Sequence, residues 1–496
     1  MLFARLPNRH PPARAGASVR ARGMTRRRAV ARAAGMTRSG AVARAVGMAL
    51  GLAGILVLPG IAEAAPRYVP HELLVGYRTG RVPAATARVQ AQLGVPTRPR
   101  ATAPRSQVLR LRPGQSVIAA ARRLRRRPGV AYAEPNYVAH QAGAFYPDDR
   151  GKIGVPGGWQ RLQWNLLPGT GINAPGAWGN LLAAGHPGGR GVTVAILDTG
   201  VAYRNWRQYR RSPDLGNTRF VAPYDFVASN RYPLDRNGHG TFVASVVGES
   251  TNNNIGLTGL AYGASIMPVR ILDASGLGDE NTIARGIRYA VTHHAQVINL
   301  SLEFLPNEVS SSNQIPEIVD AINFAHQHGV VVVGAAGNDQ DTRIAYPARA
   351  HNVISVGATT KDGCLAGYSN GGSGLDLVAP GGGTDALIPS DPNCFPDRSL
   401  PSIYQMTLVD TPHWSRFGYP NYYIGTSMSA PEVAATCALV IASRVLGSHP
   451  SPAQVLARLE QTAAPLGGSH PNAQFGYGLL DAGAATAPAA SSPPPA

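Results

Sequence analysis

Four short segments of the sequence carry polar residues of the types that activate a nucleophile. They read "VAILDTG" with Asp198, "NGHGTF" with His239, "AAGND" with Asn338 and "GTSMSAP" with Ser427. A serine becomes a nucleophile only when a base lies beside it and a third group orients that base. In chain order these residues supply an orienting carboxylate, a base, an amide donor and a hydroxyl. Together they could perform acyl transfer, provided that the fold brings them into one place.

Each of these residues, taken alone, has an ordinary structural explanation. "DTG" also occurs in aspartic proteases, but those enzymes need two such carboxylates to share a proton. The chain has one "DTG" and no "DSG", which excludes that class. His239 could be a satisfied surface or core histidine, and Asn338 could be a turn asparagine. Ser427 could simply cap the apolar helix that follows it.

The elements that must position these residues are short apolar strands alternating with helices. Near-continuous Val, Ile and Leu runs are typical of strands buried on both faces of a parallel sheet. The expected strands cover 192–200, 265–273, 295–302, 329–337 and 352–360, and the expected helices cover 280–294 and 315–328. This pattern predicts a layered α/β domain with a mostly parallel central sheet. In such sheets, functional residues gather at the carboxyl ends of the strands.

The charge of the chain divides it into parts. The formal net charge is +18, of which residues 1–64 carry +10, residues 65–140 carry +12 and residues 141–496 carry −4. A basic nucleic-acid-binding protein is therefore excluded if the first 140 residues are removed. Residues 65–140 have their own pattern of strands (71–78, 106–112 and 129–138) around a helix at 117–127, which predicts a small α+β domain.

The first 64 residues read as an Arg-rich leader and a secretory signal peptide. An uncharged apolar run from Ala45 to Ala62 follows Arg44 and ends in the small-residue pattern Ala62-Glu63-Ala64. The alternative is a membrane anchor, although glycines and Pro59 interrupt the run. Translation could start at Met24, Met36 or Met48. At the other end, residues 486–496 form a low-complexity tail rich in Pro, Ala and Ser.

From about Gln163 to Ala485, the order and approximate spacing of the four segments resemble the subtilisin-like serine proteases. The resemblance implies a three-layer peptidase domain over residues 141–485, preceded at 65–140 by an inhibitory propeptide that assists folding. It makes Ser427 the nucleophile as well as a helix cap, His239 the general base, Asp198 its orienting partner and Asn338 an oxyanion donor. A catalytically dead relative would lack one of these residues, and none is missing.

The resemblance also implies a substrate cleft beside the nucleophile. Its walls would be Ser301, Leu302 and Glu303 in "VINLSLEF", and Ala335, Ala336 and Gly337 in "AAGND". These residues are mostly small or apolar, and the floor is expected near Ala345, so we expect a preference for large apolar residues on the acyl side of the cut bond. The family commonly has glycine at the position of Glu303, whose acidic side chain could narrow the pocket or favour a basic residue instead.

The loop "TNNNIGLTG" (251–259) resembles the calcium loop of the same family. Calcium binds six to eight oxygen ligands, which carboxylates, amides and backbone carbonyls supply. The expected Ca²⁺ ligands are the side chains of Asp149, Asp214 and Asn253 and the carbonyls of Thr251, Ile255 and Leu257. The alternative is a polar surface loop that binds no ion.

The remaining features concern the compartment and the partners. Cys364 and Cys394 lie in loop sequence and could pair in an oxidising compartment, or could both stay reduced. Cys437 lies on the apolar face of the helix after Ser427, where we expect it to be buried. The resemblance implies a secreted monomer that acts on proteins or peptides and is inhibited by its own propeptide. No nucleic-acid partner is expected, and no membrane span once the signal peptide is removed.

Overall fold

A computed structural model provides the structure of the chain. It describes residues 68–79, 82–96, 106–137, 143–386, 394, 401–410 and 413–488. The expected leader and signal peptide, and most of the expected tail, lie outside these residues. Within the described part of the chain, no helix is both long and apolar enough to cross a membrane.

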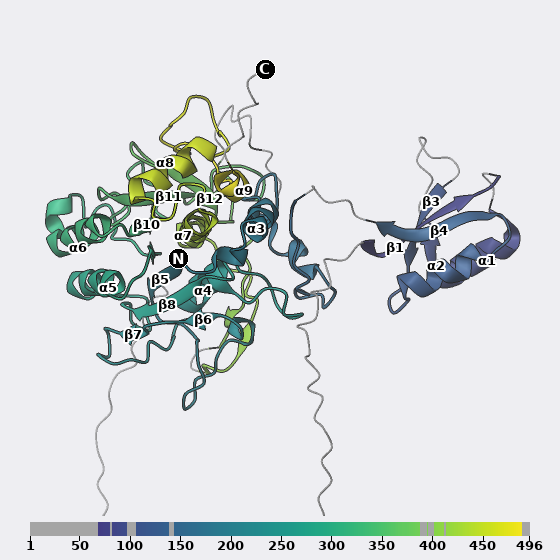
Figure 1. The fold of residues 1–496 in the computed structure, drawn as a ribbon, viewed down its shortest axis with the longest axis horizontal. Coiled ribbons are helices and arrows are strands. Elements are labelled where there is room, and N and C mark those ends of the chain that lie inside the picture. The colour runs from purple at the N-terminus through teal and green to yellow at the C-terminus, as the bar shows by residue number, and fades with distance from the viewer. Residues whose placement is uncertain are drawn as a thin grey trace, which may run out of the picture. The chain divides into compact units, whose positions relative to one another are not determined.

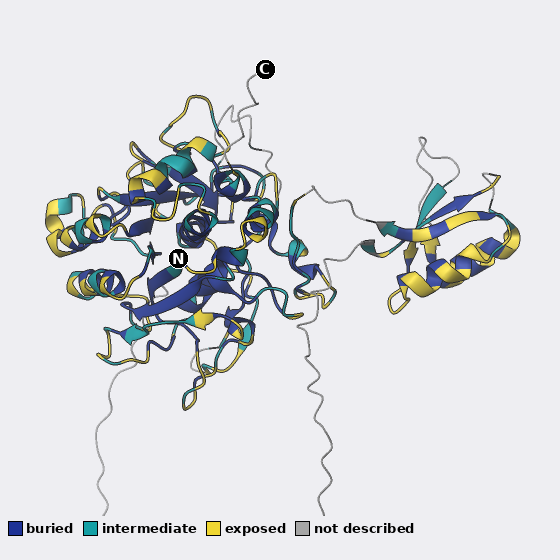
Figure 2. Ribbon diagram, in the orientation of Figure 1, coloured by how far each residue is buried: buried dark blue, intermediate teal, exposed yellow. Residues whose placement is uncertain are grey.

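The N-terminal part is a small α+β domain, as predicted. Its elements are β1 (Tyr68–Tyr77), α1 (Ala84–Leu93), β2 (Gly94–Pro96), β3 (Ser106–Leu111), α2 (Val117–Arg125) and β4 (Val130–Tyr137). The strands pair in the antiparallel order β2-β3-β1-β4. Buried side chains of α2, such as Leu124, pack with Leu73 and Leu109 of the sheet, while the other face of the helix is exposed (Figure 2). The domain therefore has a core of its own.

The larger part is built on an eight-stranded sheet. The strands are β5 (Thr193–Asp198), β6 (Arg219–Phe220), β7 (Tyr224–Asp225), β8 (Ser265–Arg270), β9 (Val297–Leu300), β10 (Val331–Ala335), β11 (Val353–Thr359) and β12 (Leu377–Pro380). Their order is β12-β11-β10-β9-β5-β8-β6, and β7 also pairs with β8. Every one of these pairings is parallel, which confirms the predicted sheet.

Helices cover both faces of this sheet (Figure 1). One face packs on α3 (Ala174–Ala183), α4 (His239–Gly248) and α7 (Thr426–Ser443), and the other on α5 (Glu280–Thr292) and α6 (Pro316–Gln327). Alternate residues of a strand serve the two cores: Ile196 belongs to the first and Leu197 to the second. Burial on both faces is the reason that the longer strands are mostly apolar. Helices α8 (Pro452–Thr462) and α9 (Ala482–Thr486) complete the domain.

The segment between β12 and α7 spans residues 381–425, and part of it supports α4. Residues 401–423 include a hairpin of β13 (Thr407–Leu408) and β14 (Phe417–Gly418). The Thr407 hydroxyl donates to the carbonyl of Gly238 at 2.5 Å, and the ring of Tyr423 stacks on Phe242 of α4 with a centroid distance of 4.1 Å. This part of the segment therefore packs directly against the helix that begins at His239.

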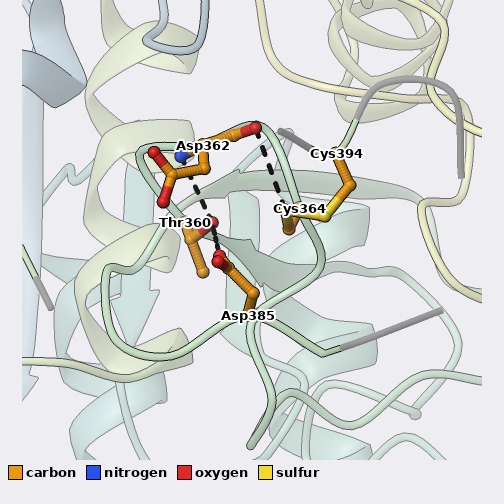
Figure 3. Close-up of a disulfide and its surroundings, with 5 residues drawn as sticks. All are labelled: Thr360, Asp362, Cys364, Asp385 and Cys394. Atoms are coloured by element: carbon orange, nitrogen blue, oxygen red, sulfur yellow. Dashed lines mark hydrogen bonds between the residues drawn. A yellow bond between two sulfur atoms is a disulfide. The ribbon is translucent and has the colours of Figure 1, made fainter. Parts of the chain in front are cut away.

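The described residues include one disulfide, which joins Cys364 to Cys394 (Figure 3). This resolves the alternative that the sequence leaves open. In the same loop the Thr360 hydroxyl donates to Asp385 at 2.5 Å and accepts from the backbone N–H of Asp362. Cys437 is a buried free thiol, as expected, and burial raises its pKa well above the usual range. Only the Cys364–Cys394 pair is therefore open to reduction among the three cysteines.

Breaking this disulfide should destabilise the larger domain. The bond spans 30 residues, and the loss of loop closure in the unfolded chain corresponds to about 3–4 kcal/mol in the chain-entropy account. We expect Cys364→Ala/Cys394→Ala to lower the free energy of unfolding by about that amount. Thermal unfolding with and without a reductant provides the control, because the reductant should affect the wild type and not the double variant. Equal melting temperatures for the oxidised and reduced wild type would contradict the prediction.

Candidate active site

The predicted site residues follow three neighbouring strands of the sheet. Asp198 is the last residue of β5, Ser301 directly follows β9, and Asn338 follows β10 by three positions. In the sheet β9 pairs with both β5 and β10, with Asn299 opposite Ile196 on one side and Val333 on the other. Because all three strands run in the same direction, their carboxyl ends lie at one edge. This edge is where the predicted residues meet.

Asp198 and His239 form a direct hydrogen bond. His239 Nδ1 lies 2.8 Å from Oδ1 and 3.0 Å from Oδ2 of Asp198. The Asp198 side chain is fully buried, and that of His239 is 13% exposed. A Cβ on Gly240 would lie 2.2 Å from the carbonyl oxygen of Gly200 and 3.1 Å from Asp198. Glycine at this position is therefore what allows the start of α4 to approach the end of β5.

Two opposing effects act on the pKa of His239. Burial lowers it, while the charge of Asp198 and the hydrogen bond that the ring donates to that carboxylate raise it. The net result is a pKa above the ordinary value of a histidine. Asp198 therefore favours the protonated imidazolium, which is the form that a general base reaches after it accepts a proton.

Asp235 organises the turn that leads into His239, and it is not among the residues predicted from the sequence. Its Oδ1 accepts hydrogen bonds from the backbone N–H groups of Asn237 and Gly238 and from the Thr199 hydroxyl. Its Oδ2 accepts from the N–H and the hydroxyl of Thr241. This buried carboxylate ties the chain after β5 to the first turn of α4. An aspartate four residues before the histidine, in "DRNGHGT", is the signal that points to it.

Ser427 does not cap α7, so that part of the sequence-based expectation is wrong. The N-cap is Gly425, which has φ +142° and makes no side-chain cap bond, and the helix begins at Thr426. The Ser427 hydroxyl donates to the carbonyl of Ser301 at 3.3 Å, and the Ser301 hydroxyl donates back to the carbonyl of Ser427 at 2.9 Å. Ser427 of α7 thus lies beside the carboxyl end of β9, and its hydroxyl does not cap the helix.

Asn338 is held from two sides. Its side-chain oxygen accepts hydrogen bonds from the N–H of Thr426 at 2.8 Å and from the Thr426 hydroxyl at 3.1 Å. Its side-chain nitrogen donates to Oε1 of Glu303 at 3.0 Å, and its backbone N–H donates to Oε2 at the same distance. Asn338 therefore links the start of α7 to the segment after β9.

The other predicted cleft residues lie in the same two segments. Ser301, Ala335 and Ala336 are buried, and Leu302 is partly buried. Ala345 lies beside Gly337, where its Cβ would be 3.0 Å from a Cβ on the glycine. The two expected walls and the expected floor are thus neighbours in space.

The expected calcium ligands are also neighbours, but they already bind one another. Asp149 accepts hydrogen bonds from the N–H groups of Asn252 and Asn253, both at 3.0 Å. Asp214 accepts from the N–H of Leu257 and from the Asn253 side-chain nitrogen, both at 2.7 Å. The oxygen of that side chain accepts from the N–H of Ile255. Over the described residues, no group of three or more His, Cys, Asp and Glu side chains is arranged to hold a metal ion.

The chemistry of this cluster nevertheless suits a cation. Burial raises the pKa of Asp149 and of Asp214 to about 7. Glu249 is fully buried, and this burial raises its pKa well above the usual value. The nearby charges of Asp214 and Asp149 raise that pKa further. One of its carboxylate oxygens, Oε2, is buried without a hydrogen-bond partner. Three buried acidic groups in one cluster are costly when ionised unless a positive charge joins them.

A family model described as the subtilase family matches residues 189–478. The chain belongs to the subtilase family. Residues 61–136 match the model of the fervidolysin N-terminal prodomain, so the small α+β domain of this subtilase is prodomain-like. The predicted fold, the resemblance and the assignment as a subtilisin-like serine endopeptidase are thereby confirmed.

Several relatives match a large part of the chain and of their own length. A thermophilic serine proteinase from Bacillus sp. (strain AK1) is 31% identical over 84% of this chain and 86% of its own length. Subtilisin Savinase from Lederbergia lenta is 34% identical over 66% of this chain and 99% of its own length. Among solved structures, a protease from Pseudoalteromonas arctica is 29% identical and covers 69% of this chain and 98% of its own, with a TM-score of 0.55.

The subtilase geometry around His239 predicts a pH dependence that Asp198 controls. A base must be neutral before it accepts a proton, so kcat/KM should rise with pH through the pKa of His239. In Asp198→Asn the attraction that raises this pKa is lost, so the acid limb should move to lower pH. The variant should also lose about 10⁴-fold in kcat, because the imidazole is no longer held in the correct tautomer.

Profiles of kcat/KM against pH for the wild type and the variant measure this effect. Asp320→Asn, a substitution at an exposed position of α6, serves as the control and should leave the profile unchanged. An acid limb at the same pH in Asp198→Asn and in the wild type would show that Asp198 does not set the pKa of the base.

Proposed function

We propose that this subtilase is a secreted endopeptidase that cleaves proteins or peptides through a triad of Asp198, His239 and Ser427, and that it is made as a self-processing prepro-enzyme. The observation that carries this proposal is the bond between buried Asp198 and His239 at the N-terminus of α4. The stack of Phe242 on Tyr423 supports it, because it joins α4 to the segment that leads into Ser427.

In the proposed reaction Ser427 Oγ attacks the peptide carbonyl while His239 Nε2 takes its proton. The imidazolium then gives that proton to the leaving amine, and water repeats the sequence on the acyl-enzyme. Asp198 keeps the proton on Nδ1 and stabilises the positive charge on the ring. The oxyanion would bind the side-chain amide of Asn338 and the backbone N–H of Ser427, which lies in the first turn of α7, where N–H groups lack intrahelical acceptors.

The proposed substrate cleft lies between Ser301–Glu303 and Ala335–Gly337. Residues 65–140 would act as the propeptide that inhibits the peptidase domain, 141–485, until it is cut off. Their net charge of +12 against −4 for the rest favours association of the two parts in solution. We propose that the cut falls between Val138 and Gly158 and that the mature enzyme is an exported monomer.

Ser427→Ala tests the proposed nucleophile. It should abolish nearly all peptidase activity, because the members of a triad act as a unit. Since Gly425 and not Ser427 caps α7, the melting temperature should change little. If the enzyme cuts its own propeptide, the variant should accumulate as a proform that still carries residues 65–140. Activity assays, thermal unfolding and N-terminal sequencing measure the three effects.

The matched control is Ser429→Ala, two residues further along the same helix. The Ser429 hydroxyl is buried and donates to the carbonyl of Ala379 at 2.9 Å, so its loss should cost about 1 kcal/mol of stability and leave the chemistry intact. Retention of activity in Ser427→Ala together with its loss in Ser429→Ala would show that the nucleophile is wrongly assigned.

We further propose that Ca²⁺ binds at the loop 251–259 and stabilises the fold without taking part in the reaction. The carboxylates of Asp149 and Asp214 and the side-chain oxygen of Asn253 would bind it, together with the carbonyls of Thr251, Ile255 and Leu257. The buried acidic cluster supports this assignment. Ion binding would replace some of the N–H bonds that these oxygens now accept.

Calcium should therefore raise the melting temperature relative to an excess of chelator. An ion that binds only the folded state contributes about 2.7 kcal/mol when its free concentration is 100 times its Kd. In Asp214→Asn this difference should shrink or vanish, whereas Asp320→Asn should retain it. Equal melting temperatures of the wild-type protein in calcium and in chelator would show that the site is absent.

A further inference from the structure

Glu303 belongs to a wall of the proposed cleft, but that place does not explain the hydrogen bonds of its carboxylate. Its carboxylate does not project freely at the rim, because both of its oxygens accept hydrogen bonds from a single residue, Asn338. The two donors are the backbone N–H and the side-chain amide, each 3.0 Å from a different oxygen. Such a two-point contact fixes the position of the amide as well as that of the backbone that carries it.

The contact depends on a glycine between the two segments. A Cβ on Gly337 would lie 2.6 Å from Oε2 of Glu303, closer than real Cβ atoms approach other atoms. Gly337 also has φ +112°, a conformation that residues with a side chain rarely adopt. The Glu303 carboxylate therefore lies directly against the backbone that precedes Asn338.

Among the described residues, the Glu303 carboxylate forms no ion pair. Within the part of the chain that the structure describes, no Lys, Arg or His nitrogen lies within 4.0 Å of it. Burial raises its pKa, and the hydrogen bond from the Asn338 side chain opposes that shift. The hydrogen bonds from Asn338 compensate for the partial burial of this acid.

The opposite end of the Asn338 amide is equally constrained. Its oxygen accepts from Thr426, the residue before Ser427, and the Thr426 hydroxyl in turn accepts from the N–H of Gly337. A primary amide has two N–H donors, of which Glu303 takes one. Over the described residues nothing accepts from the second N–H, and Thr426 and Glu303 together fix its orientation.

We propose that Glu303 is a positioning residue that aims the free N–H of Asn338 at the developing oxyanion. This inference rests on the proposed role of Asn338. Preorganised donors stabilise a transition state because they need no reorganisation during the reaction. A loosened Asn338 would bind the substrate as before but would stabilise the oxyanion less.

The test is a double-mutant cycle on Glu303→Ala and Asn338→Ala. Glu303→Ala should lower kcat about 10-fold and leave KM within about twofold, because it removes an interaction realised in the transition state. Asn338→Ala should lower kcat by about 10²–10³, the effect of removing one oxyanion donor in a subtilisin. The double variant should be no slower than Asn338→Ala, because Glu303 acts through that residue.

The controls separate positioning from other effects. Glu308→Ala removes an exposed glutamate five residues further along and should leave kcat unchanged. Glu303→Gln keeps the size of the side chain but can accept only one of the two bonds, so it should lie between wild type and Glu303→Ala. If Glu303→Ala does not fold, Glu303→Gln replaces it in the double-mutant cycle with Asn338→Ala. Covalent titration with an organophosphonate gives the concentration of competent sites for every variant.

Three results would overturn the inference. The first is an unchanged kcat in Glu303→Ala. The second is a loss of kcat on Glu303→Ala that is equally large in the wild type and in the Asn338→Ala variant. The third is a constant kcat in Glu303→Ala together with a change in KM, or in the preference between substrates that have Phe or Arg before the cut bond. That result would make Glu303 a specificity residue. If Asn338→Ala itself keeps full kcat, the oxyanion assignment fails instead, and that outcome is recognised from the single variant alone.

Discussion

The parallel pairing of β10, β9 and β5 is the constraint on which the candidate site depends. Three neighbouring strands of one sheet end at the same edge, and each ends in, or is followed by, a residue of the site. Helices α4 and α7 pack on one face of this sheet, so that their first turns deliver His239 and Ser427 to that edge. A strand shifted by one residue would turn its side chains to the opposite face and separate these groups.

Holding charged groups at a buried edge requires that each be satisfied there. Asp198 is bonded to His239 and to the N–H of Thr199, and Asp235 accepts five hydrogen bonds from the turn around the histidine. Glu303 is satisfied by Asn338 alone. The cluster around Asp149 and Asp214 differs, since it retains a buried oxygen without a partner.

Sequence patterns predicted the sheet well because its strands are buried on both faces and leave long apolar runs. The short strands β6 and β7, of two residues each, carry no such pattern, and neither do α1 and β2 of the prodomain-like part. The bond between Asp198 and His239 was predictable from residue types and order. The cap of α7 was not, because it depends on the backbone conformation of Gly425 and not on the chemistry of Ser427. Nor could the contact of Glu303 with Asn338 be deduced, since it joins residues 35 positions apart across two strand ends.

The segment before α7 limits how this protein can be re-engineered. Loops between a sheet and a helix are usual places for grafting, shortening or fusing a second domain. Here Thr407 and Tyr423 tie such a segment to α4, and the N–H of Met406 donates to buried Glu249 at 3.1 Å. A cassette exchange that removed residues 401–423 would take away the N–H that donates to Glu249 and the ring that stacks on Phe242. Length variation in this region must therefore be accompanied by matched changes in α4, so the two segments constitute a single unit of design.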